Sequence, residues 1–174
     1  RSFAGEASIV AGRVLELAND PEGCRQVQRA LEAALDDESR ERIALELKGN
    51  VAEAARSPYA NFVIQKCVTT LPPHAFSFIF EELMAEQVLT FAKHKFACRV
   101  LQRLMEQGVR PQVDRLLEAL LGHVVELSRH PYGNYVVQHM LAQGSPEQRA
   151  SVTEAVTAEA AALCRDTFGS NVVR

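Results

Sequence analysis

A nine-residue phrase that occurs five times at nearly constant spacing constrains the fold of this chain more than any other feature. The copies begin at Asp20, Ser57, His94, His130 and Asp166. We number each motif from the fifth residue of its phrase, so position 1 is Cys24, Asn61, Cys98, Asn134 or Ser170, and these residues lie 37, 37, 36 and 36 residues apart. A fixed period of this length is typical of a solenoid, in which each unit buries its apolar face only by stacking on its neighbours.

The apolar residues recur with a helical period, and no stretch keeps the alternation of a β-strand. We expect a helix after each phrase, then a second helix, such as 73–86 or 146–162, and a short apolar segment before the next phrase. The helices that follow the phrases are expected at 24–35, 61–70, 98–107 and 134–143, and the short segments at 51–55, 88–92, 124–127 and 161–164. The sequence therefore predicts an all-α, right-handed α-solenoid of roughly 36-residue three-helix repeats, an armadillo-like superhelix that forms a single domain over 1–174.

The composition excludes several classes of protein. The chain of 174 residues is 47% hydrophobic but has no run of about 18 apolar residues, so we expect no membrane span. The four cysteines include no C-x-x-C pair, which favours reduced thiols in an intracellular protein over a disulfide framework or a zinc site. Because the chain starts at Arg1 and ends within the fifth motif, we expect a fragment of a longer array.

The motif itself has two faces when it is placed on a helix. In the second copy, residues 63, 64, 67 and 68 are apolar and form a stripe that must face the core. Asn61 and Gln65 are four residues apart and therefore stand one above the other on the opposite face, with Phe62 at the border. Each unit is thus expected to present two short polar or small groups and one flat side chain.

The charge is unevenly distributed along the chain. The net charge is −3, yet the eight residues from each of the first four position 1 residues, together with 170–174, contain no Asp or Glu. The same windows contain Arg25, Arg29, Lys66, Arg99, Arg103 and Arg174. We therefore expect one cationic face on an acidic body, a distribution that attracts a polyanion to that face.

This combination of side chains suits single-stranded RNA. An unstacked base needs a planar partner for its face, which Tyr, Phe and Arg supply, and hydrogen-bonding groups for its edge, which Asn and Gln supply. Stacking contributes about 1–3 kcal/mol for each base. Five such sets at one period predict a surface that takes one base for each unit.

The motifs resemble the RNA-binding repeats of the Pumilio (PUF) family. Asn61-Phe62-Val-Ile-Gln65 and Asn134-Tyr135-Val-Val-Gln138 are similar to the base-reading helix of that family, and the resemblance covers four repeats and a truncated fifth. It implies that positions 1 and 5 read the base edge and that position 2 stacks. The implied edge residues are Cys24, Gln28, Asn61, Gln65, Cys98, Gln102, Asn134, Gln138, Ser170 and Arg174, and the implied stacking residues are Arg25, Phe62, Arg99, Tyr135 and Asn171.

The resemblance also implies a target sequence. Cys with Gln favours adenine and Asn with Gln favours uracil, and the RNA runs antiparallel to the protein, so the expected site is 5′-(G/C)UAUA-3′. The first base stays open, because Ser170 and Asn171 imply guanine whereas Arg174 in place of the usual Glu implies cytosine. The first repeat also departs from the family pattern, since Asp20-Pro-Glu-Gly lacks the aromatic residue before Gly.

By the same resemblance, the parent protein is expected to bind 3′-untranslated regions of mRNA and to lower translation or mRNA stability. Its expected partners are deadenylase or translational repressor proteins on the convex face. We expect a cytoplasmic monomer that uses no metal or other cofactor and catalyses nothing, because no nucleotide-binding, nucleophile-elbow or metalloprotease motif occurs.

Other interpretations of the same residues remain open at this point. The polar residues of a single motif are more often merely solvated, but their recurrence in four units favours a shared role. Phe62 and Tyr135 could belong to the core, but Arg25, Arg99 and Asn171 occupy the same position and do not fit a core. Arg29, Lys66 and Arg103 are either solvated charges or phosphate contacts. The aromatic residues two before position 1 are expected to be core staples, namely Tyr59, Phe96, Tyr132 and Phe168. The competing function is a HEAT- or armadillo-like scaffold whose groove binds a protein or peptide.

Overall fold

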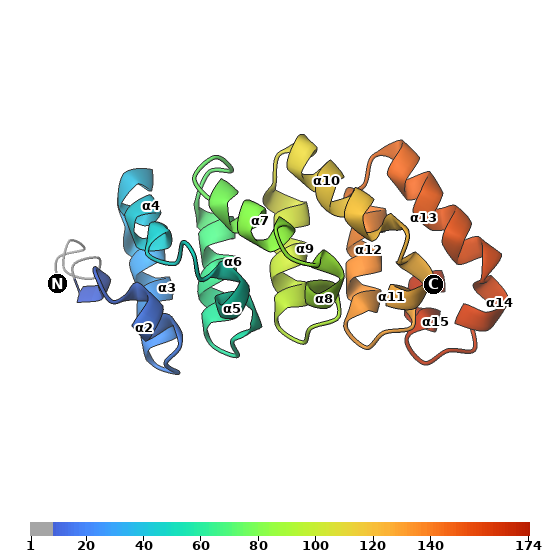
Figure 1. The fold of residues 1–174 in the computed structure, drawn as a ribbon, viewed down its shortest axis with the longest axis horizontal. Coiled ribbons are helices and arrows are strands. Elements are labelled where there is room, and N and C mark those ends of the chain that lie inside the picture. The colour runs from blue at the N-terminus through green and yellow to red at the C-terminus, as the bar shows by residue number, and fades with distance from the viewer. Residues whose placement is uncertain (1–8) are drawn as a thin grey trace. The chain divides into compact units, whose positions relative to one another are not determined.

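The structure is a computed structural model that describes residues 9–174 (Figure 1). Every regular element among these residues is a helix, which confirms the expected all-α class. The chain divides into two compact units, one ending at Glu86 and the other starting at Gln87. The single domain over 1–174 stays a prediction, and its first eight residues lie outside the described residues.

Each unit is built from repeats of a short helix, a motif helix and a further helix. The first unit contains α2 (Val14–Ala18), α3 (Gly23–Ala33), α4 (Asp37–Leu45), α5 (Val51–Arg56), α6 (Ala60–Thr70) and α7 (Ser77–Met84). The second contains α8 (Val88–Ala92), α9 (Ala97–Gln107), α10 (Arg110–Leu121), α11 (Val124–Ser128), α12 (Gly133–Gln143), α13 (Pro146–Ala158), α14 (Ala160–Leu163) and α15 (Gly169–Val173). The motif helices stack on one another, α3 on α6 in the first unit and α9 on α12 in the second (Figure 1).

The motif helices begin one residue before the predicted starts, and the short helices fall where the apolar segments predicted them. The second helices are shorter than predicted. Instead of 73–86, α7 covers only Ser77–Met84, because the chain first makes a turn after Pro72 and Pro73. The expected helix 146–162 is divided at Glu159, where α13 ends and α14 begins.

The apolar stripe of the motif helix forms the core, as the sequence predicts. In α6 the side chains of Val63, Ile64, Cys67 and Val68 are completely buried. Positions 3 and 4 of α9 and α12 are likewise buried. In α3, however, position 3 is Gln26, which is only half-buried.

A side chain at the first residue of every phrase fixes the start of the motif helix. The first turn of an α-helix leaves backbone N–H groups without an intrahelical partner. Asp166 Oδ1 accepts hydrogen bonds from the N–H groups of Phe168 and Gly169 at 2.9 and 2.8 Å, and His130 Nδ1 accepts from those of Tyr132 and Gly133 at 3.1 and 3.2 Å. The residues that accept in this way are Asp20, Ser57, His94, His130 and Asp166.

In the first unit, carboxylates also cap the short helices. Glu82 accepts from the N–H groups of Gly49 and Val51 at 2.6 and 3.1 Å, and Glu46 makes the same pair of bonds at the start of α2. The φ angle of Gly49 is +87°, a value that a side chain would strain. These bonds connect the short helix of a repeat to the third helix of the same repeat, which we call the outer helix.

The His130 cap makes stability depend on pH. Burial and the nearby charge of Lys93 lower the pKa of His130 from its ordinary 6.5. The unfolded chain therefore binds a proton more readily than the folded chain, so the stability is complete above about pH 6.5 and is lost as the pH falls through the lowered pKa. Between about pH 7.5 and about pH 5.5 we expect the melting temperature to fall less in His130→Asp than in the wild type.

Asp is a matched replacement for this purpose, because Asp166 makes the same two bonds and these bonds lower the pKa of its carboxyl group. The aspartate cap therefore stays ionised at the lower pH. Thermal unfolding followed by circular dichroism gives the comparison. An equal fall in the two proteins would mean that His130 is not the group responsible.

Candidate nucleic-acid interface

Position 1 of the first four motifs lies inside the protein, although the sequence places it among the residues that touch a base. The Asn134 side chain is 0% exposed, and its Nδ2 donates to the carbonyl oxygens of His130 and Pro131, both at 2.9 Å. Asn61 is 1% exposed and donates to the carbonyl of Ser57 at 2.7 Å. Each asparagine closes the turn that leads into its own helix.

The cysteines at position 1 do the same with a thiol. Cys24 Sγ donates to the carbonyl of Pro21 at 3.3 Å, and Cys98 Sγ to that of Lys95 at 3.6 Å. Burial raises the pKa of both thiols, and it raises the pKa of Cys67 to about 12. These thiols are therefore protonated at neutral pH, which does not suit a nucleophile or a metal ligand.

Position 5 is oriented by position 1. Gln65 Nε2 donates to Asn61 Oδ1 at 3.0 Å, and Gln138 Nε2 donates to Asn134 Oδ1 at 3.3 Å. In the first repeat, Gln28 Nε2 instead donates to the backbone carbonyl of Cys24 at 3.1 Å. These three glutamines are half-buried, whereas Gln102 in α9 is buried. The amide is thus held by a side chain in the asparagine repeats and by the backbone in the first cysteine repeat.

Position 2 points outward in the four complete motifs. Phe62 is 48% exposed and Tyr135 is 50% exposed. Arg25 and Arg99 are exposed at the same position, and Asn171 of the fifth motif is half-buried. The interpretation of Phe62 and Tyr135 as core residues is therefore wrong.

The aromatic residues two before position 1 were expected to be core staples, and this expectation is wrong. Tyr59 is 38% exposed, and Phe96, Tyr132 and Phe168 are half-buried. Two of these rings lie beside the capping histidines instead, with ring centroids 5.9 Å apart for His94 and Phe96 and 5.8 Å apart for His130 and Tyr132.

Position 6 is basic in each of the four complete motifs, and each of these side chains lies close to a carboxylate. The candidate phosphate contact Arg29 lies 3.8 Å from Glu22, Lys66 is paired with Glu32, and Arg103 Nη1 lies 2.5 Å from Glu106 Oε2. The expected cationic face is therefore partly neutralised by acids that stand just outside the windows counted in the sequence. The sequence analysis also missed His139, which is position 6 of the fourth motif and lies 2.8 Å from Glu106.

The fifth motif is short in this chain. Ser170 Oγ donates to the carbonyl of Thr167 at 3.3 Å, the same kind of bond that the cysteines make. Position 5 is Arg174, the last residue, which is exposed.

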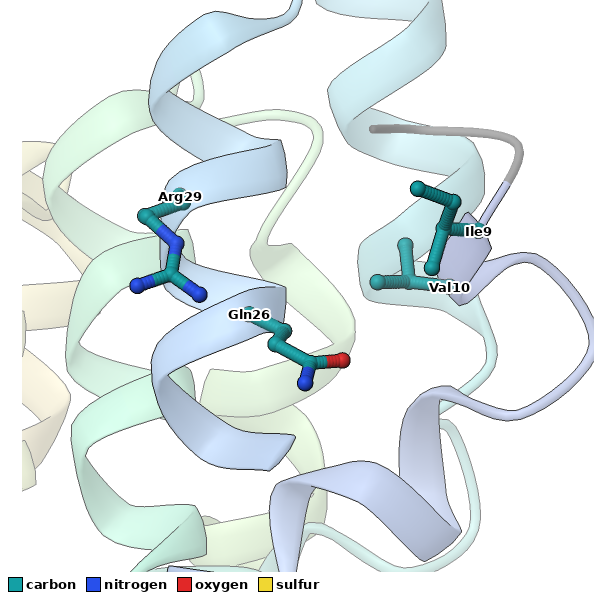
Figure 2. Close-up of a pocket in the computed structure, with 4 residues that line it drawn as sticks. All are labelled: Ile9, Val10, Gln26 and Arg29. Carbon is teal, nitrogen blue, oxygen red and sulfur yellow. The ribbon is translucent and has the colours of Figure 1, made fainter. Parts of the chain in front are cut away.

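Other kinds of site find little support in the described part of the chain. Among residues 9–174, no three or more His, Cys, Asp or Glu side chains are grouped as a metal ion would need. None of the helices described is long and apolar enough to cross a membrane. A cavity of about 240 Å³ in the first unit is lined by Ile9, Val10, Gln26 and Arg29 (Figure 2) and brings no acid or nucleophile to a substrate.

Comparison with known proteins assigns the family. The model of the Pumilio-family RNA-binding repeat matches residues 13–48, 50–84, 87–121 and 123–157, which is most of the chain. The chain belongs to the Pumilio family. Each match coincides with one set of short helix, motif helix and outer helix, so the Pumilio repeat and the structural repeat are the same unit.

Relatives and solved structures agree with this assignment. Pumilio homology domain family member 4 of Saccharomyces cerevisiae is 33% identical over 88 residues, which is 51% of this chain and 10% of that protein. Pumilio homolog 12 of Arabidopsis thaliana is 26% identical over 114 residues, 66% of this chain and 19% of that protein. The chain thus spans only a small part of these relatives.

Solved Pumilio structures match almost the whole chain. The Puf4 RNA-binding domain bound to an HO endonuclease 3′ UTR recognition sequence has a TM-score of 0.85 and 29% identity, over 99% of this chain and 55% of that one. PUF-8 in complex with PBE-RNA has a TM-score of 0.92 and 26% identity, over 98% of this chain and 50% of that one. These matches confirm the solenoid of repeats.

The burial of position 1 separates two effects of substitution. Asn134→Ala removes a buried amide that satisfies two carbonyl groups, and we expect it to lower the free energy of unfolding by about 1–3 kcal/mol. Tyr135→Ala removes an exposed ring and should change that free energy by less than about 0.5 kcal/mol. Urea unfolding followed by circular dichroism measures both, and equal losses would contradict the assigned roles.

Proposed function

We propose that this Pumilio-family chain binds single-stranded RNA sequence-specifically through the helix face that carries positions 2 and 5. The observation that carries the proposal is the exposure of the planar side chains at position 2 of four consecutive motifs, beside the glutamines of position 5. Phe62 and Tyr135 are large aromatic groups that remain half-exposed in a structure whose other apolar side chains are mostly buried. Solved relatives with the same fold are bound to RNA, which supports this assignment.

Stacking provides affinity in this proposal. The rings of Phe62 and Tyr135 and the guanidinium groups of Arg25 and Arg99 each take one base against their planar face, with Asn171 as the fifth member. A stacked base contributes about 1–3 kcal/mol, irrespective of its identity. Stacking alone therefore does not select a sequence.

Base selection comes from positions 1 and 5 acting together. The amide of Gln65 or Gln138 is held by an asparagine, whereas the amide of Gln28 is held by a backbone carbonyl. In both settings the glutamine amide keeps one N–H group and its carbonyl oxygen for a base edge, so the difference between the asparagine and cysteine repeats lies in position 1 itself. We assign uracil to the asparagine repeats and adenine to the cysteine repeats.

The proposed target is 5′-(G/C)UAUA-3′, read antiparallel to the chain. The proposed edge residues are Cys24, Gln28, Asn61, Gln65, Cys98, Gln102, Asn134, Gln138, Ser170 and Arg174. In the cell we propose recognition of mRNA 3′-untranslated regions, with repression of translation or promotion of decay through deadenylase or repressor proteins. We propose that the protein acts as a cytoplasmic monomer and without catalysis.

Fluorescence anisotropy with labelled RNA tests the proposal. At about 50 and 200 mM salt, RNA that contains 5′-CUAUA-3′ or 5′-GUAUA-3′ should bind more tightly than RNA with CUCUA or poly-C. Tyr135→Ala should weaken binding to the UAUA site by about 5- to 150-fold, the loss of one stacked base. The ratio of the C and G sequences identifies the base that the fifth motif prefers.

Tyr135→Ala is a better test than Asn134→Ala, because its side chain contributes little to the fold and a loss of binding then reports the contact itself. Leu35→Ala, which removes an exposed apolar side chain outside the motifs without changing the charge, is the matched control. Equal weak binding to every RNA, or no binding by a folded protein, would overturn the proposal and favour a helical scaffold that binds another protein or peptide.

A further inference from the structure

Two ion pairs join neighbouring motif helices at the same motif positions. In the first unit, Lys66 on α6 pairs with Glu32 on α3. In the second unit, His139 Nε2 on α12 lies 2.8 Å from Glu106 Oε1 on α9. In both pairs a basic side chain at position 6 lies beside an acidic side chain at position 9 of the preceding motif helix, so the contact is a repeated feature of the array.

These pairs lie on the helix face that is proposed to bind RNA. Position 6 is four residues after position 2, and position 9 is four residues after position 5, so the four positions share one side of the helix. The structure shows this proximity directly, since His139 Nδ1 lies 3.0 Å from the backbone carbonyl of Tyr135. A base stacked on Tyr135 would bring its own sugar and phosphate close to this group.

Glu106 lies between two basic side chains. Its Oε2 accepts from Arg103 Nη1 at 2.5 Å, and its Oε1 lies 2.8 Å from Nε2 of His139. The other ring nitrogen of His139 lies 3.0 Å from the Tyr135 carbonyl oxygen. The geometry is therefore that of one carboxylate held by a guanidinium group and an imidazole ring.

We propose that Glu32 and Glu106 occupy the places of RNA phosphates on this face, and that bound RNA replaces each carboxylate with a backbone phosphodiester. The inference rests on the proposed RNA binding and adds to it a phosphate site at position 6 and an internal competitor at position 9. A phosphodiester offers the same paired oxyanions to Arg103 and His139 as the carboxylate does.

Because both ion pairs are partly exposed, the replacement of a carboxylate by a phosphate costs little free energy. The Lys66 and Glu32 side chains are 26% and 55% exposed, and those of His139 and Glu106 are 27% and 23% exposed. Ion pairs that water reaches contribute little to stability, so a phosphate can displace the carboxylate without unfolding the array. The carboxylates then lower the affinity for any polyanion and leave sequence selection to positions 1 and 5.

Glu106→Gln tests the inference, because it removes the charge and keeps the shape. We expect it to bind UAUA-containing RNA about two- to five-fold more tightly than the wild type at low salt. The slope of log affinity against log salt should stay close to that of the wild type, because the phosphodiester contacts the same basic side chains in both complexes. Glu154→Gln, an exposed residue of α13, makes the same change in net charge away from the motif helices and should have a smaller effect.

His139→Gln gives the opposite test, since it removes one of the proposed phosphate contacts. It should weaken binding, with the preference for UAUA over CUCUA unchanged. Thermal unfolding of each variant confirms that the protein measured is folded.

The outcomes separate this inference from the proposed function. If the wild type prefers UAUA but Glu106→Gln binds no more tightly than Glu154→Gln, the carboxylate is only a structural link and the inference fails while the function stands. If the folded wild type binds no RNA, the proposed function and the inference both fail.

Discussion

The start of the motif helix is the point on which the rest of each repeat depends. A side chain four residues ahead of position 1 accepts two backbone N–H groups, and position 1 donates back to the turn, as His130 and Asn134 do in the fourth repeat. The residue that directly precedes position 1, Gly133 in this repeat, must be small. A Cβ atom on Gly133 would lie 2.8 Å from the carbonyl oxygen of Leu127, because α11 passes close to the start of α12. Because its first turn is fixed in this way, the motif helix exposes only one of its faces to solvent.

Much of this arrangement could be predicted from the sequence because it depends on periodicity. The five phrases gave the repeat length, and the stripe of Val63, Ile64, Cys67 and Val68 identified the buried face correctly. Exposure of Phe62 and Tyr135 also followed from the pattern, since arginine takes their place in other repeats and a core position would not accept it. Helix ends were less predictable, and α7 is shorter than expected because a turn follows Pro72 and Pro73.

The contacts that the sequence did not predict join residues about one repeat apart. Glu32 and Glu106 lie one residue beyond the windows in which the charges were counted. Glu32 contacts position 6 of the next motif, and Glu106 contacts position 6 of its own motif and of the next. His139 was missed for a related reason, since it was not aligned with Arg29, Lys66 and Arg103 in the motif register. Similarly, polar residues were assumed to be outward-facing, whereas hydrogen bonds to the preceding turn let Asn61 and Asn134 be buried.

The chemistry of position 1 links the proposed base selection to folding. Every copy places a small donor there: the amides of Asn61 and Asn134, the thiols of Cys24 and Cys98, or the hydroxyl of Ser170. Each donates to a backbone carbonyl three or four residues earlier, and a buried carbonyl that loses its donor destabilises the fold. A position that selected bases alone could accept many side chains. A position that must also close this turn is restricted to short groups with a hydrogen to donate, so Asn, Cys and Ser are the range over which a repeat can change the proposed base preference without losing its helix.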